Sequence, residues 1–161
     1  MSVSVFAQNK KPRVSPPDTA IGMIGNAHIT IAYSSPSVKN REIWGVLVPY
    51  DSVWRAGANE ATTFETDKDV KIQGKRLPAG IYSFFIIPQK GDRWIAIFNK
   101  TAKQWGAFKY DATQDQLRVK VYPGPLMISH PQEMLKYNIK QNGFTLNWEN
   151  VSIPVLIKTA E

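Results

Sequence analysis

The stretch Asn26-Ala-His-Ile-Thr-Ile-Ala-Tyr33 decides the fold class, because apolar residues occupy every second position. Side chains of a β-strand point alternately to the two faces of its sheet, so a period of two predicts a strand with one buried face. We expect the strand to end at Ser34-Ser35-Pro36-Ser37, because proline has no amide hydrogen to donate and serine favours local backbone hydrogen bonds. The side chains on the face expected to be buried are Ala27, Ile29, Ile31 and Tyr33.

Short strand patterns continue along the chain. Ile81–Ile87 is apolar at positions that face both ways, which predicts a central strand covered on both sides. Arg93–Phe98 follows after a short turn and predicts a hairpin with it. Thr62–Thr66 and Val70–Gln73 are separated by three polar residues and predict a second hairpin.

The C-terminal third shows the same pattern. Leu117–Val121 alternates and predicts a strand buried on one face. Asn142-Gly143 favours a tight hairpin turn between two apolar runs, and Val151–Ile157 predicts the last strand. Pro154 within it indicates a sheet edge or a bulge. About nine short strands in all predict an all-β fold, an antiparallel β-sandwich or a jelly-roll-like arrangement, while Ile43–Val48 and Gln132–Lys140 stay unassigned.

Composition agrees with one β-rich domain. The chain has 161 residues, of which 43% are hydrophobic, with 11 Pro and 10 Gly. Such a length supports a single core without disulfide or metal. No apolar run approaches the roughly 20 residues of a membrane-spanning helix, so no transmembrane segment is expected. We expect residues 15–161 to form the domain and residues 1–14 to be a truncated signal remnant and polar leader.

The charge pattern limits the partners. There are 20 Lys and Arg against 13 Asp and Glu, a net charge of +7, but the lysines are spread along the chain. Nucleic-acid readers cluster basic residues on one face, so no nucleic-acid partner is expected. The chain has no cysteine, and its two histidines, His28 and His130, belong to no ligand pair such as His-x-His, so neither a metal nor another cofactor is expected.

The first residues indicate export. Val5-Phe-Ala7 before Gln8 resembles the end of a secretory signal with its small-residue cleavage site. We therefore expect an exported protein, periplasmic or extracellular, whose signal is truncated in this chain. The alternative is an ordinary N-terminus that carries no signal.

The segment from Trp54 to Thr62, here called the Trp54–Thr62 loop, is the strongest candidate for a site. Arg55, Asn59 and Glu60 lie within six positions among small residues. Arginine binds anions through paired hydrogen bonds, and Trp54 offers a stacking surface, so the loop predicts a ligand cradle. In the structural alternative, Arg55 and Glu60 satisfy loop polar groups and bind nothing.

Aromatic residues give further candidates. We expect Trp94 and Trp148 in the core because they lie in strand patterns, and Trp105 beside Gly106 to be exposed. Tyr33 and Trp54 are the next candidates for a surface that packs against a sugar ring. No catalytic residue can be assigned, because no nucleophile motif is present.

Several phrases together resemble one bacterial family, that catalogued as domain of unknown function 2911. They are Ser35-Pro-Ser-Val-Lys39, Val53-Trp-Arg-Ala-Gly-Ala-Asn-Glu-Ala-Thr62, Leu77-Pro-Ala-Gly-Ile-Tyr82 and Gln104-Trp-Gly106. The resemblance runs from about Ser15 to Ile157. It implies an exported protein, and it adds Lys39 and Thr62 to the candidate residues, but it implies no catalytic residues because such proteins have no assigned activity.

These observations predict an exported binding domain. Its ligand is expected to be a small polar molecule or carbohydrate, or else another envelope protein, held by the Trp54–Thr62 loop with Tyr33, Lys39 and Trp105 nearby. Two alternatives stay open. One is a hydrolase that uses Glu60 as general acid or base, which requires a raised carboxyl pKa, and the other is a purely structural or interaction module.

Overall fold

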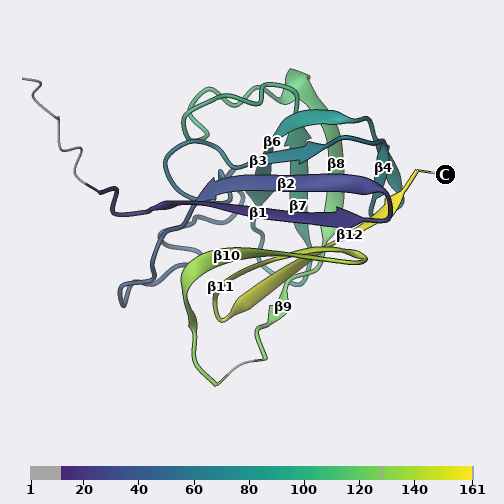
Figure 1. The fold of residues 1–161 in the computed structure, drawn as a ribbon. Coiled ribbons are helices and arrows are strands. Elements are labelled where there is room, and N and C mark those ends of the chain that lie inside the picture. Colours follow the sequence, from purple (N-terminus) through teal and green to yellow (C-terminus); the bar gives the residue numbers. More distant parts are fainter. Residues whose placement is uncertain (1–11, 128, 161) are drawn as a thin grey trace, which may run out of the picture.

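The alternating stretch forms β2 (Ala27–Ser34), and its four predicted inward side chains are buried. The computed structural model describes residues 12–127 and 129–160. Two antiparallel sheets pack face to face (Figure 1), one in the order β1-β2-β3-β6-β7-β8 and one in the order β10-β11-β12-β4-β5, with β9 paired to β12. The predicted all-β antiparallel sandwich is therefore confirmed.

The remaining elements are short, as the frequent turns predict. One 3₁₀ turn, η1 (Ala112–Gln114), precedes β8, and the described residues include no helix long and apolar enough to cross a membrane. The other strands are β1 (Pro17–Ile24), β3 (Thr63–Thr66), β4 (Val70–Ile72), β5 (Lys75–Leu77), β6 (Gly80–Ile87), β7 (Trp94–Asn99), β8 (Asp115–Val121), β9 (Gly124–Pro125), β10 (Gln132–Lys140), β11 (Gly143–Glu149) and β12 (Val151–Thr159).

The predicted central strand is β6, and it is covered on both sides. It lies between β3 and β7, and Phe84 on one face joins the main core between the sheets. Phe85 on the other face packs with Ile97 and against the ring of Tyr110, at a centroid distance of 5.2 Å. The segment after β7 therefore covers the outer face of the first sheet here. The predicted hairpin of β6 and β7 is also confirmed.

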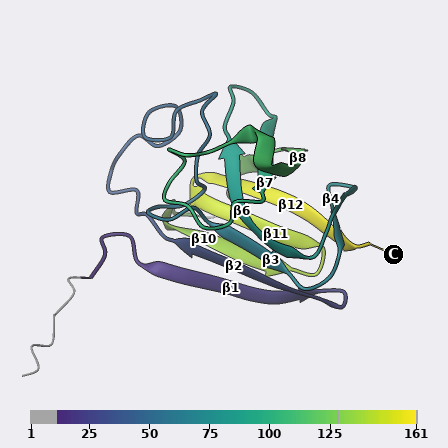
Figure 2. The same ribbon diagram turned by 90° about the horizontal axis from the view of Figure 1, so that it is seen from above.

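The second predicted hairpin, between Thr62–Thr66 and Val70–Gln73, is wrong. β3 pairs with β2 and β6, whereas β4 pairs with β12 and β5 in the opposite sheet. The residues between them pass from one layer to the other, a connection seen from above in Figure 2. Both strands bury alternate side chains against the same core, so their pattern does not show which layer each joins.

The described residues form twelve strands where about nine were expected. The strands without a predicted counterpart are β1, which exposes Ile21 and Met23, the three-residue β5 and the two-residue β9. The previously unassigned Gln132–Lys140 forms β10, and it makes the expected hairpin with β11. Pro154 lies between the part of β12 that pairs with β9 and the part that pairs with β4. On this edge of β12 no strand is paired at Pro154, so the missing amide hydrogen costs no ladder hydrogen bond.

Candidate functional site

The Trp54–Thr62 loop closes one end of the sandwich and is tied to its neighbours by backbone hydrogen bonds. Trp54 exchanges two of these with Ile86 of β6, at 2.8 and 2.9 Å. Three further N–H···O bonds join Ala58 to Ser34 at 3.1 Å, Ala61 to Gln104 at 2.9 Å and Gly106 to Asn59 at 3.0 Å. These bonds tie the loop backbone to β6, to the end of β2 and to the segment around Gln104–Gly106.

The small residues of the loop allow its backbone to pack closely against neighbouring segments. The Ala56 carbonyl accepts hydrogen bonds from the hydroxyls of Tyr137 at 2.6 Å and Thr62 at 3.0 Å, both of which are buried. Burial raises the pKa of Tyr137 well above its usual value, so its hydroxyl stays a donor. A Cβ on Gly57 would lie 2.8 Å from Thr62 Oγ1 and 3.0 Å from the Ser34 carbonyl oxygen, so only glycine fits. Thr62 therefore braces the loop from inside.

Arg55 lines a concavity of about 230 Å³, here called the Arg55 pocket. Its Nε atom is buried and has no hydrogen-bond partner among the described residues. Burial lowers the pKa of the Arg55 guanidinium from its usual value. The pocket is lined by Ser15, Pro36, Arg41, Leu47, Val48, Trp54, Arg55, Gly57, Ala58 and Trp148. No acidic residue is among them, so the guanidinium keeps a partly desolvated, uncompensated charge.

Arg41 adds a second guanidinium to the Arg55 pocket. Its Nε donates to the Val38 carbonyl at 3.0 Å and its Nη2 donates to the Ser37 carbonyl at 2.5 Å. These bonds fix the side chain, but carbonyl oxygens do not neutralise its charge. Two arginines with no carboxylate between them make the pocket electropositive, which suits an anionic ligand.

Tryptophans form the apolar wall of the same pocket. The rings of Trp54 and Trp148 are stacked, with centroids 6.0 Å apart and an interplanar angle of 14°. Trp44 contacts both rings edge-on, at 5.5 and 6.0 Å, and contacts Trp94 at 5.1 Å. Trp94 and Trp148 are buried as predicted, and Trp54 is half-buried. The wall is therefore rigid and continuous with the core.

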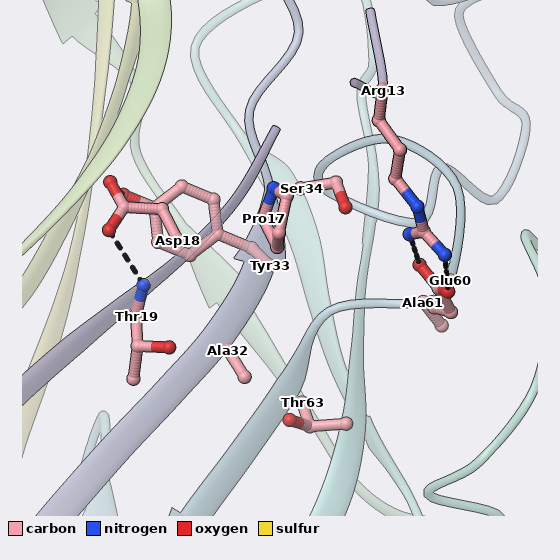
Figure 3. Close-up of a pocket in the computed structure, with 10 residues that line it drawn as sticks. All are labelled: Arg13, Pro17, Asp18, Thr19, Ala32, Tyr33, Ser34, Glu60, Ala61 and Thr63. Carbon is pink, nitrogen blue, oxygen red and sulfur yellow. Dashed lines mark hydrogen bonds and ion pairs between the residues drawn. The ribbon is translucent and has the colours of Figure 1, made fainter. Parts of the chain in front are cut away.

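A second, larger hollow of about 510 Å³ lies where β1 and β3 begin and β2 ends, and we call it the Tyr33 hollow (Figure 3). Arg13, the cationic residue that lines it, is already paired with Glu60. Arg13 reaches Glu60 with two hydrogen bonds, at 2.7 and 2.8 Å, and the Tyr33 hydroxyl donates to Asp18 at 3.1 Å. Burial raises the pKa of Tyr33 to about 12. The hollow therefore leaves no unpaired positive charge for an anionic ligand to neutralise.

The ion pair between Arg13 and Glu60 argues against the hydrolase alternative, in which Glu60 acts as a general acid. Hydrogen bonds from the Arg13 guanidinium lower the pKa of the Glu60 carboxyl. A general acid needs the opposite shift, and Glu60 is also exposed rather than enclosed in a cleft. The geometry therefore gives no support to Glu60 as an acid catalyst.

The eight predicted site residues are divided among different surroundings. Trp54 and Arg55 line the Arg55 pocket, whereas Tyr33 and Glu60 line the Tyr33 hollow. The other four residues line neither hollow. Thr62 is buried, and the Asn59 side chain donates from Nδ2 to the Ser15 carbonyl at 3.3 Å. Lys39 is exposed, and its backbone N–H donates to Glu133 Oε1 at 3.0 Å, while Trp105 is 55% exposed, as expected.

Sequence reasoning missed three contributors to these hollows. Arg13 and Ser15 come from the segment before β1, and Arg13 lies in the part expected to be a leader. Arg41 comes from a turn with no recognisable motif. The predicted signal remnant, Met1–Gln8, lies outside the described residues. Within residues 12–127 and 129–160, no three His, Asp or Glu side chains gather closely enough to hold a metal ion.

Comparison with known proteins identifies one family. The model of the family described as "Protein of unknown function (DUF2911)" matches residues 15–157, nearly the whole chain, so the protein belongs to that family. A search of curated proteins gave no significant match, and a search of solved structures also gave none.

Proposed function

We propose that this DUF2911 protein is a binding domain that takes a small polar ligand with a carboxylate, such as an acidic sugar, in the Arg55 pocket. The observation that supports this is the guanidinium of Arg55, which is partly buried and has no acidic partner among the described residues. Removing a charge from water without a partner is costly. A bound carboxylate would supply the partner through charge-assisted hydrogen bonds.

The pocket's other walls fit the same ligand class. Trp54 provides an aromatic surface of the kind that packs against the apolar side of a sugar ring, while Ser15 and Arg41 provide polar contacts at the edge. Ligand sites typically combine an apolar wall with a few fixed polar groups. The Tyr33 hollow is larger, but its cation, Arg13, is paired with Glu60, so we assign the anionic ligand to the Arg55 pocket.

Matched ligand pairs test the proposal. We expect glucuronate to bind at least roughly tenfold more tightly than glucose, and benzoate more tightly than benzamide, because a charged hydrogen bond contributes about 1.5–3 kcal/mol. In the Arg55→Met variant, we expect the affinity for both carboxylates to fall by the same factor or more. Titrations followed by NMR chemical shifts of the labelled protein measure each dissociation constant.

Arg93→Met is the control, because Arg93 is exposed and lies outside the Arg55 pocket, and the substitution removes the same charge. It should bind as the unmodified chain does. Equal binding of the charged and neutral ligands, no binding of either carboxylate, or unchanged binding by Arg55→Met would each contradict the proposal.

The exported location is part of the same proposal. It is supported by the signal-like Val5-Phe-Ala7 and not by any described contact. Fractionation of the source cells tests it: we expect the protein in the envelope or the medium, and a purely cytosolic protein would contradict export.

A further inference from the structure

Lysines that are far apart in the sequence meet on the outer face of the second sheet. In the strand register, Lys71 of β4 lies directly between Lys158 of β12 and Arg76 of β5. Adjacent strands are about 4.8 Å apart, so these three residues form a basic row across the sheet. Figure 1 shows β10, β11 and β12 below β1 and β2, with β4 near the C-terminus.

Two further lysines lie on the same face, on β10. Leu135 and Tyr137 are buried, so alternation places Lys136 and Lys140 on the outer face, and both are exposed. Lys136 pairs in register with Asn147, and Lys140 pairs with Gly143. We call the set Lys71, Arg76, Lys136, Lys140 and Lys158 the basic face.

The positive charge of the basic face is mostly uncompensated. Arg76 forms an ion pair with Asp69, but the four lysines form none with any described residue. Among the exposed and half-buried residues of the described strands of this sheet, the acidic ones are Glu133 of β10 and Glu149 of β11, both at the end of the β10–β11 pair opposite to Lys140. Like charges placed opposite one another destabilise a sheet, so the fold gains nothing from this row.

We propose that the basic face docks on an anionic lipid surface. Each lysine near such a surface strengthens binding about fivefold whatever its exact position, so a broad spread of lysines suits a membrane. Leu156, which is 52% exposed, lies among them and can contact the headgroup region. The inference is independent of the Arg55 pocket.

The outer face lacks the features that nucleic acids require. The outward strand positions of this sheet carry no aromatic side chain on which a base could stack. Four of its five basic residues are lysines, which bind as point charges, and the single arginine is occupied by Asp69. We therefore assign the face to lipid headgroups rather than to DNA or RNA.

Vesicle co-sedimentation of the full chain tests the proposal. We expect binding to vesicles of three parts phosphatidylcholine to one part phosphatidylglycerol, no binding to phosphatidylcholine alone, and release by high salt. The variant K71E/K136E/K158E should lose roughly 100-fold or more in affinity. The control K90E/K103E/K109E reverses three exposed lysines that lie outside the basic face and should retain most of the binding.

The alternatives give distinct results. An equal loss in both triple variants would show that only net charge matters, and binding to a DNA duplex as tight as that to the vesicles at equal salt would assign the face to nucleic acid. Either result, or no binding to the anionic vesicles, overturns the proposal. If K71E/K136E/K158E fails to fold by circular dichroism, the corresponding glutamine variant takes its place. Arg55→Met should bind the vesicles normally, which separates this test from that of the Arg55 pocket.

Discussion

Replacing Gly143 with alanine is expected to lower the free energy of unfolding by at least about 3 kcal/mol. A Cβ at this position would lie 2.0 Å from the carbonyl oxygen of Val155, and Gly143 has a φ of 145°. The atom it meets belongs to the backbone of β12, so no side-chain rotation can relieve the overlap. The β11–β12 pairing, which joins Gly143 to Leu156, would have to open locally. Urea denaturation measures the loss.

Two other glycines separate the causes of this loss. Gly91 also has a positive φ, of 105°, but a Cβ there would meet nothing within 4 Å, so Gly91→Ala should cost only about 1 kcal/mol of backbone strain. Gly124 has no such φ and equally open surroundings, so Gly124→Ala should change stability by less than about 0.5 kcal/mol. A Gly143→Ala protein as stable as the Gly91→Ala protein would contradict the close strand contact.

Trp148→Ala is expected to cost about 3–5 kcal/mol of stability and to weaken carboxylate binding as well. Trp148 is only 2% exposed, stacks on Trp54 and forms part of the Arg55 pocket. Its removal leaves a cavity between the core and the pocket, so Trp54 loses its support. Urea denaturation and glucuronate titration measure the two effects.

Trp105→Ala is the matched control, because Trp105 is the same residue type and is 55% exposed. Its side chain lies outside the Arg55 pocket, so the loss of stability should stay below about 1 kcal/mol and binding should persist. If Trp105→Ala and Trp148→Ala lost the same stability and the same affinity for glucuronate, the role assigned to Trp148 in supporting the pocket would be contradicted.

The fold class could be predicted because burial leaves a direct mark on the sequence. Alternation at Ala27–Tyr33 showed one buried face, and the continuous apolar run Ile81–Ile87 showed two, as β2 and β6 confirm. The same pattern failed at β3 and β4. Both strands bury alternate residues against one core from opposite sides, and no local signal distinguishes a hairpin turn from a passage between layers.

Only part of the candidate site could be predicted from the sequence, because the rest depends on contacts between distant segments. The sequence pointed to Arg55 because this residue lies in a dense polar segment, and to Trp54 because this aromatic residue directly precedes Arg55. Arg41 and Ser15 come from other segments and reach the same pocket only through the tertiary fold. The basic face shows the same limit: Lys71 and Lys158 are separated by most of the chain, and strand register alone brings them together.

The central claim is that Arg55 serves a ligand and not the fold, and the unfolding free energy of Arg55→Met without ligand tests it most directly. Methionine keeps most of the length of the side chain and removes a partly desolvated charge whose buried Nε has no hydrogen-bond partner among the described residues. We expect the variant to be about as stable as the unmodified chain or up to about 1 kcal/mol more stable. A loss of more than about 1 kcal/mol would show that the guanidinium braces the loop, and would contradict the account.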